Sequence, residues 1–282
     1  MKILILGVSG LIGSTIYRYF DSATQYNVVG TVRTDKPKFS HNSNNIRCGI
    51  DALNFDSVKK LIDEIRPDQI INCIGITKHV PAQSDAFKLI QLNSAFPHFL
   101  ANLSTEVDSR LIHISTDCVF AGDIGGYTEM SRTDANDMYG KTKAIGEIHD
   151  KKHVTIRTST IGHEIDTKHG LLEWFLSQNK SCFGYRNAIF SGIPTIRLAK
   201  ILASNVVPEW GLTGLFNLSA DPINKFDLLN KIKQRYRKDI EIVASDDFII
   251  DRSLNGELFK SRTGVVLPDW DELIFEMYQT RN

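Results

Sequence analysis

The sequence has no excess of either charge, no long apolar run and no cysteine motif. Lys plus Arg and Asp plus Glu each number 33 in 282 residues, so the formal net charge is zero. This balance argues against a general nucleic-acid or membrane binder, and no apolar stretch is long enough to cross a bilayer. The four cysteines stand singly, without the spacing of zinc ligands or of a redox motif. We therefore expect reduced thiols in a cytoplasmic protein.

A secretory signal and a metal-ligand cluster are also missing. The apolar run that follows Met1 and Lys2 is too short for a signal peptide, which again favours a cytoplasmic location. The eight histidines show no spaced cluster, so we expect no protein-built metal site. The chain is nevertheless long enough to bury a sizeable core, in one large domain or two modest ones.

Short apolar runs alternate with helical patterns through the first half of the chain. Continuous apolar strands separated by helices indicate a parallel sheet that is covered on both faces. We therefore predict an α/β fold, a Rossmann-like doubly wound parallel sheet with a smaller irregular α/β substrate lobe. The predicted strands are 3–6, 27–33, 46–50, 69–74, 110–115 and 154–157, and the predicted helices are 11–20, 57–65, 85–103 and 139–150.

The regular alternation ends near residue 160. Helical patterns return at 170–176, 196–206 and 225–236, between loops that are rich in Gly and Pro. We expect residues 1–160 to form a dinucleotide-binding domain, to which later parts of the chain can return. Residues 161–282 are expected to form mainly the substrate-binding lobe.

A glycine-rich loop follows the first predicted strand and opens the first predicted helix. In this context Gly7 permits a tight turn, Gly10 lets backbone amides approach a pyrophosphate, and Gly13 lets helix and strand pack closely. The helix N-terminus adds unpaired N–H groups and partial positive charge. The spacing is G-x-x-G-x-x-G rather than G-x-G-x-x-G. We assign the loop to a dinucleotide cofactor, with binding residues Gly7, Ser9, Gly10, Leu11, Ile12 and Gly13.

The end of the second predicted strand distinguishes between the two nicotinamide cofactors. An enzyme that uses NAD usually has Asp or Glu at this point, to bind the ribose 2′-hydroxyl. This chain has Arg33, whose guanidinium suits a 2′-phosphate instead. We therefore favour NADPH, while the nearby Asp35 keeps NADH open.

Two more strand ends are expected to line the cofactor. Asp51, followed by Ala52, would either accept a hydrogen bond from the adenine amine or cap the next helix, and the two alternatives stay open. Cys73, Ile74 and Gly75 lie at the end of the fourth predicted strand, where an open parallel sheet binds its ligand.

Tyr139 and Lys143 are four residues apart, so they share one face of a predicted helix. A nearby cation favours the phenolate and lowers the pKa of the phenol, which can then protonate a reacting carbonyl near neutral pH. Ser115 and Thr116 close the fifth predicted strand, and their side chains alternate, so one hydroxyl should face Tyr139. A Tyr/Lys pair alone is usually a solvated helix face. Its combination with the glycine loop indicates catalysis.

These motifs resemble those of the extended short-chain dehydrogenases/reductases and, more narrowly, of the dTDP-4-dehydrorhamnose reductases. Members of that family often have Tyr where this chain has Cys118. The sequence of the predicted substrate-binding lobe also differs considerably from the family's pattern. The similarity runs through Ser191-Gly192-Ile193-Pro194-Thr195 to Leu267-Pro268-Asp269-Trp270. It is carried by the glycine loop, Ser115-Thr116-Asp117-Cys118-Val119-Phe120-x-Gly122, Tyr127-x-Glu129, Tyr139-Gly140-Lys141-Thr142-Lys143-x-x-Gly146-Glu147 and Arg157-Thr158-Ser159.

The resemblance implies NADPH-dependent reduction of a nucleotide-linked 4-keto-6-deoxysugar, in deoxysugar biosynthesis for surface polysaccharide. It selects Thr116 over Ser115 as the hydroxyl that binds the carbonyl, so that Thr116, Tyr139 and Lys143 form the catalytic set. It also implies that Ser115, Tyr139 and Lys143 contact the cofactor. Tyr139 would protonate the developing alkoxide, and Lys143 would hold the nicotinamide ribose.

The substrate side is less well defined by the sequence. Lys78, Thr116 and Ser159 are candidates for contact with the nucleotide sugar, although a loop lysine such as Lys78 is more often merely solvated. A guanidinium can clasp two oxygens of a diphosphate. Three arginines are therefore candidates, without any ranking: Arg186, Arg197 and Arg252. We expect no nucleic-acid or membrane partner, and a homodimer is left open.

Two other functions share these motifs. A nucleotide-sugar epimerase or dehydratase has the same fold and Tyr/Lys pair, but a 4,6-dehydratase commonly has Asp-Glu after the Thr, whereas Asp117 is followed here by Cys118. A non-catalytic NADP-binding regulatory subunit is the other alternative. The presence of Thr116, Tyr139 and Lys143 argues against it, since a binding module does not need all three.

Overall fold

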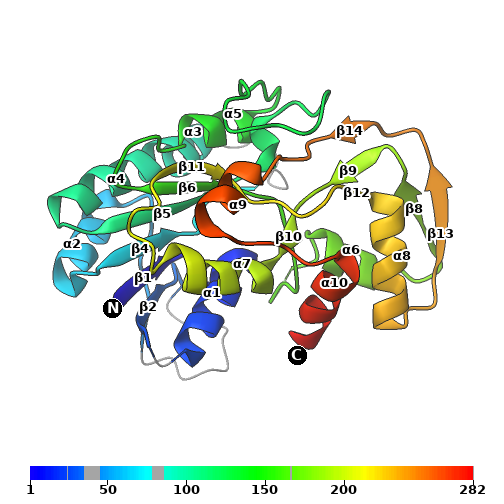
Figure 1. Ribbon diagram of the computed structural model, residues 1–282. Helices are drawn as coiled ribbons and strands as arrows, with labels where there is room; N and C mark the ends of the chain where they lie inside the picture. The colour runs from blue at the N-terminus through cyan, green and yellow to red at the C-terminus, as the bar shows by residue number, and fades with distance from the viewer. Residues whose placement is uncertain (24, 35–44, 78–85, 166, 282) are drawn as a thin grey trace.

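The predicted doubly wound parallel sheet is confirmed by the computed structural model, which describes residues 1–23, 25–34, 45–77, 86–165 and 167–281. The described residues form a main sheet of seven strands in the order β11-β6-β5-β4-β1-β2-β3, and each pair is parallel (Figure 1). Its strands are β1 (Lys2–Leu6), β2 (Asn27–Thr31), β3 (Ile46–Arg47), β4 (Gln69–Asn72), β5 (Arg110–Ser115), β6 (Val154–Arg157) and β11 (Gly214–Asn217).

Helices cover both faces of this sheet because successive side chains of a strand point to opposite sides. Ile3 and Ile5 of β1 join the apolar cluster of α1 (Leu11–Ser22) and α7 (Thr195–Ile201). Leu4 and Leu6 join a second cluster, with α2 (Phe55–Ile65) and α4 (Phe96–Glu106). Each apolar run in the sequence therefore fills two cores, as a strand buried on both faces requires.

The predicted helix 85–103 is helical wherever the structure describes it, from residue 86 to 106. It consists of α3 (Ala86–Ile90), one π turn, η2 (Gln91–Ala95), and α4. The predicted helix 139–150 is wrong at its C-terminal end, because α5 spans Met138–Ile145. Gly146 ends it and packs so closely on the carbonyl of Asn93 that a Cβ atom would collide there.

The lobe beyond residue 160 contains more regular structure than the sequence indicated. The predicted helices are found as α6 (Leu171–Ser177), α7 with its π continuation η4 (Leu202–Val206), and α8 (Lys225–Tyr236). Helices α9 (Glu257–Thr263) and α10 (Trp270–Gln279) were not predicted. Short strands pair as β7 (Thr160–Ile161) with β10 (Ile193–Pro194), β8 (Ser181–Tyr185) with β13 (Glu241–Ser245), and β9 (Ala188–Phe190) with β12 (Ile223–Asn224) and β14 (Ile250–Asp251).

The late strand β11 leaves this lobe and pairs with β6 at the edge of the main sheet (Figure 1). A domain boundary near residue 160 remains a prediction. None of the helices in the described ranges is long and apolar enough to span a membrane.

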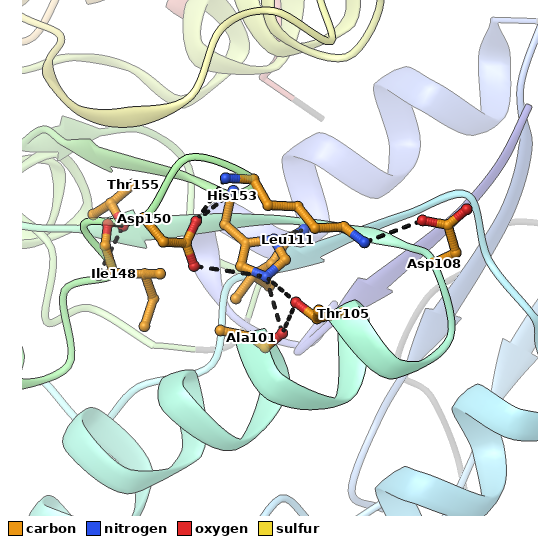
Figure 2. Close-up of polar contacts among 9 residues, drawn as sticks. Ala101, Thr105, Asp108, Leu111, Ile148, Asp150, His153 and Thr155 are labelled. Atoms are coloured by element: carbon orange, nitrogen blue, oxygen red, sulfur yellow. Dashed lines mark hydrogen bonds and ion pairs between the residues drawn. The ribbon is translucent and has the colours of Figure 1, made fainter.

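A buried histidine ties α4 to the sheet (Figure 2). The Nδ1 atom of His153 accepts a hydrogen bond from the backbone N–H of Leu111 at 3.1 Å, and Nε2 lies 2.9 Å from the carbonyl oxygen of Ala101. Asp150 accepts from the backbone N–H of His153 at 2.8 Å. Burial lowers the pKa of His153, so the ring is neutral and carries its proton on Nε2, where it can donate to Ala101.

Candidate active site

The loop between β1 and α1 owes its shape to two glycines. Gly7 has a φ of +84°, and a Cβ atom there would lie 2.7 Å from Cγ1 of Ile74. A Cβ atom at Gly13 would collide with the carbonyl oxygen of Gly7. Both positions therefore accept only glycine, for backbone and packing reasons. The loop therefore packs the start of α1 closely against the ends of β1 and β4.

Gly10 differs from these two glycines because nothing crowds it. A Cβ atom at Gly10 would have only the carbonyl oxygen of Gly7 within 4 Å, at 3.6 Å. Gly10 is also the N-cap of α1, and no side chain of the described residues caps that helix. Its exposed backbone thus leaves room beside a helix N-terminus, where anions bind. Ser9 is exposed as well, and Leu11 and Ile12 are half-buried. The loop fits a pyrophosphate.

Two alanine substitutions separate the folding role of this loop from its binding role. Gly13→Ala should lower the free energy of unfolding by about 1–3 kcal/mol, because its methyl group meets backbone atoms. Gly10→Ala should leave the unfolding free energy near the wild-type value, since its φ of −84° suits alanine, but should weaken NADPH binding. Denaturant unfolding and cofactor titration of both variants check this. A Gly10→Ala protein that binds NADPH like the wild type would contradict a phosphate contact at this amide.

The other predicted cofactor residues lie at the same edge of the sheet. Cys73 follows β4 and donates its backbone N–H to the carbonyl of Leu6 at 3.2 Å, and Ile74 packs against Gly7. Gly75 is exposed. Cys73 and Ile74 therefore border the glycine loop, and Gly75 lies beside the amide of Asn93. Their contact with a cofactor remains a prediction.

The structure decides one of the alternatives for Asp51. The N-cap of α2 is Asn54, whose side chain accepts from the N–H of Ser57 at 3.0 Å. The alternative that Asp51 caps this helix is therefore wrong. Asp51 accepts from the N–H of Leu53 at 3.0 Å, and Ala52 is buried.

Arg33, the proposed reader of a 2′-phosphate, is exposed just beyond the end of β2. An exposed guanidinium at this strand end is accessible to a ligand. Asp35, which keeps NADH open, lies outside the described residues.

Lys143 is buried, and its position is set by α5 and β5. Its Nζ atom donates to the carbonyl oxygen of Ile114 at 2.8 Å. Burial lowers the pKa of Lys143 to about 8, and the nearby Glu147 carboxylate and Cys73 thiol partly oppose this effect. The ammonium therefore lies between the end of β5 and Cys73, which in turn borders the glycine loop.

Tyr139 meets Thr116 one turn before Lys143 on the same helix. Burial raises the pKa of the phenol, the Cys118 thiol and the Asp117 carboxylate raise it further, and a hydrogen bond with the Thr116 side chain opposes them. The expected lowering of this pKa by Lys143 is therefore wrong for this structure. Lys143 donates to a backbone carbonyl, and desolvation is the larger effect. The phenol keeps its proton at neutral pH.

Thr116 and Ser115 have different partners. Thr116 caps the short 3-10 turn η3 (Asp117–Val119), and its hydroxyl accepts from the N–H of Cys118 at 3.1 Å. The Ser115 hydroxyl donates to the Glu147 carboxylate at 2.7 Å. The geometry thus brings Thr116 rather than Ser115 to Tyr139, in agreement with the resemblance. The expected cofactor contact of Ser115 remains a prediction.

Two supporting groups were not predicted from the sequence. Glu147 forms a bidentate ion pair with Arg157, at 2.8 and 2.7 Å, which anchors the segment after α5 to β6. The amide of Asn93 in η2 accepts from the N–H of Ile76 at 2.9 Å and donates to its carbonyl at 3.0 Å. Asn93 thereby fixes the segment after β4 beside α5. Its position in an otherwise apolar helical pattern was the signal that could have revealed it.

The predicted substrate residues are only partly brought together. Lys78 lies outside the described residues. Ser159 is half-buried, and its carbonyl accepts from the N–H of Ile193 at 2.9 Å. The Nε atom of Arg252 donates to the carbonyl of Phe120 at 2.8 Å. The other two candidate arginines, Arg197 and Arg186, have carboxylate partners elsewhere, in Glu276 and Asp246.

Known proteins share both the sequence pattern and the fold. Residues 1–181 match the sequence model of a family described as RmlD substrate binding domain. Methionine adenosyltransferase 2 subunit beta of Mus musculus is 30% identical over 146 residues, which are 52% of this chain and 41% of that protein. The dTDP-4-dehydrorhamnose reductase of Shigella flexneri is 32% identical over 168 residues, 57% of this chain and 52% of that protein.

The chain therefore spans about half the length of these two relatives. A crystal structure of dTDP-4-dehydrorhamnose reductase from Bacillus anthracis str. Ames in complex with NADP has a TM-score of 0.83 to this chain. The match covers 99% of both chains at 20% identity, so this likeness concerns the fold.

Proposed function

The chain belongs to the RmlD substrate binding domain family, and from this premise we propose that it is an NADPH-dependent reductase of a nucleotide-linked 4-keto-6-deoxysugar. Its product would be a deoxysugar nucleotide for surface polysaccharide. The observation that carries the proposal is that the Thr116 side chain lies beside the buried Tyr139 phenol, one helical turn from the buried Lys143. The structural neighbour from Bacillus anthracis is a complex with NADP, which supports the choice of cofactor.

The glycine loop and Arg33 would hold the diphosphate and the 2′-phosphate of NADPH. When bound, the cofactor would supply the hydride that reduces the ketone. Tyr139 would give its proton to the ketone oxygen as that oxygen becomes a hydroxyl, and its raised pKa ensures that the proton is present at neutral pH. Thr116 would donate a hydrogen bond to the same oxygen as its charge grows. Lys143 would hold the nicotinamide ribose.

The proposal is tested with a panel of nucleotide-linked 4-keto-6-deoxysugars. The purified protein is mixed with NADPH and each compound, and loss of NADPH absorbance is followed, with the Tyr139→Phe protein as control. We expect turnover of at least one compound by the wild type. Absence of turnover across the whole panel, from a protein that binds NADPH, would refute the reductase function.

The choice of NADPH has a test of its own. Arg33→Ala should raise the KM for NADPH by roughly 10- to 100-fold, because a charged hydrogen bond is worth about 1.5–3 kcal/mol. The KM for NADH should be unchanged, since NADH has no 2′-phosphate. Initial rates with the two cofactors, each at saturating sugar nucleotide, provide the comparison. Equal losses for both cofactors would show that Arg33 does not read the phosphate.

A specific observation favours a second candidate, a non-catalytic NADP-binding subunit. The mouse relative is named a subunit of a methionine adenosyltransferase. Such a protein would bind NADPH but would not oxidise it, whichever keto-sugar nucleotide is added. A nucleotide-sugar epimerase, in contrast, would be purified with NAD tightly bound and would not consume added NADPH. The panel therefore separates the reductase from the other two functions, and the presence or absence of tightly bound NAD in the purified protein separates the epimerase from the subunit.

A further inference from the structure

Arg252 is tied to the turn that follows Thr116. Its Nε atom donates to the carbonyl of Phe120 at 2.8 Å, and Nη1 lies 3.6 Å from the Sγ atom of Cys118. Among the described residues no carboxylate pairs with this guanidinium, and Nη2 makes no hydrogen bond. A half-buried guanidinium without a carboxylate partner has N–H donors available for a ligand.

The segment around Arg252 is docked closely enough to fix the side chain. Asp251 donates its backbone N–H to the carbonyl of Gly122 at 2.7 Å, and Tyr127 donates its N–H to the carbonyl of Ser253 at 2.9 Å. Gly122 has a φ of +96°, and a Cβ atom there would lie 2.9 Å from Cγ of Arg252. The guanidinium is therefore positioned before any ligand arrives, which reduces the entropy lost on binding.

Cys118 connects this guanidinium with the catalytic groups. Its backbone N–H donates to the hydroxyl of Thr116 at 3.1 Å, and its thiol lies close enough to Tyr139 to raise the pKa of the phenol. Only the Cys118 side chain thus separates Arg252 from the hydroxyls of Thr116 and Tyr139, which hold the ketone oxygen in the proposed function. In a 4-keto sugar the carbon that bears the diphosphate lies across the ring from the ketone. A group beside Cys118 consequently meets the sugar end of the substrate.

We propose that Arg252 binds the sugar ring itself, through an oxygen substituent next to the reacting ketone, and that the small side chain of Cys118 leaves room for it. This inference rests on the proposed reductase function. It assigns the sugar rather than the diphosphate to Arg252. Neither of the other two candidate arginines is given this sugar contact: Arg197 pairs with Glu276 at 2.6 Å, and Arg186 is exposed, 3.9 Å from Asp246.

The test compares ligands with and without the sugar. Arg252→Gln should raise the KM for the keto-sugar nucleotide about tenfold or more, because a charged donor is lost from the sugar contact. The affinity for dTDP alone, the affinity for NADPH and the thermal midpoint should stay at wild-type values. Arg186→Gln, an exposed arginine of the same lobe, is the matched control and should change none of these quantities.

Binding measurements keep this test independent of turnover. Calorimetric titration with dTDP and with unreactive dTDP-glucose gives the contribution of the sugar even if no reduction is found, so failure of the reductase function is recognised separately. An equal loss of affinity for both ligands would assign Arg252 to the diphosphate and overturn the proposal. Unchanged affinity for both, or a parallel loss of NADPH binding, would also overturn it.

A second variant tests the role of the small side chain. Cys118→Phe should reproduce the effect of Arg252→Gln on the sugar nucleotide, because the ring would displace the guanidinium. A Cys118→Phe protein with wild-type affinity for dTDP-glucose would refute the claim that Cys118 makes room for Arg252.

Discussion

Tyr139→Phe is expected to lower kcat for reduction of the keto-sugar by roughly 10²–10⁴-fold, the usual contribution of general acid catalysis. Only the hydroxyl is removed, so α5 and the buried Lys143 should keep their places. NADPH binding should therefore be retained. The loss should be seen in kcat rather than in KM, because the proton is transferred only as the ketone reacts. Steady-state rates and cofactor titration of the variant check both expectations.

A tyrosine outside the site serves as the control for this prediction. The Tyr26 hydroxyl donates to the carbonyl of Ala203, and the residue immediately precedes β2, far along the sheet from Tyr139. Tyr26→Phe should keep the wild-type kcat. If Tyr139→Phe also turned over at the wild-type rate, the phenol could not be the proton donor.

Arg157→Met should be the most destabilising of these substitutions. The side chains of Arg157 and Glu147 are 2% and 1% exposed, and the guanidinium also lies over the ring of Phe120 at 5.1 Å. Removing Arg157 leaves a buried carboxylate without its bidentate partner, at a cost of about 3–5 kcal/mol. Chemical denaturation should show a lower free energy of unfolding by this amount.

The double variant Glu147→Leu/Arg157→Met separates the buried charge from lost packing. With both charges of the pair removed, an apolar pair of similar size should recover much of the stability, because neither member of the pair is left buried alone. The recovery should be incomplete, since Lys143 loses the carboxylate that opposes its desolvation. The difference between the double variant and the sum of the single ones gives the coupling energy. A double variant as unstable as that sum would assign the effect to packing alone.

The main sheet could be predicted because its strands carry their signal locally. Residues 3–6 are an apolar run bounded by loops, and residues 110–115 contain the apolar Leu111, Ile112 and Ile114; each segment is a buried strand. The end of α5 could not be placed, since Gly146 stops the helix through its packing on Asn93, a residue distant in sequence. Strands β8 and β13 were missed because most of their side chains are exposed or half-buried, and their pairing joins segments about sixty residues apart.

The placement of Tyr139 and Lys143 on one helix face could be predicted from the sequence, whereas the direction in which the pKa of Tyr139 shifts could not. Tyr139 and Lys143 lie one above the other on α5, as the interval of four residues predicts. The direction of the pKa of Tyr139 depends on burial, which residue spacing does not reveal. The choice of Thr116 over Ser115 came from the family resemblance and stays a prediction; the structure adds that the Ser115 hydroxyl donates to Glu147.

The late return of the chain has a consequence during synthesis. Strand β11 supplies the edge partner of β6, and the segment around Arg252 packs on the turn after Thr116. A nascent polypeptide that has left the ribosome only as far as β6 would possess the glycine loop, Tyr139 and Lys143, but neither of these two pieces. In such a polypeptide β6 would keep an unpaired edge, and the turn after Thr116 would lack the contact with Arg252, until the last third of the chain has emerged.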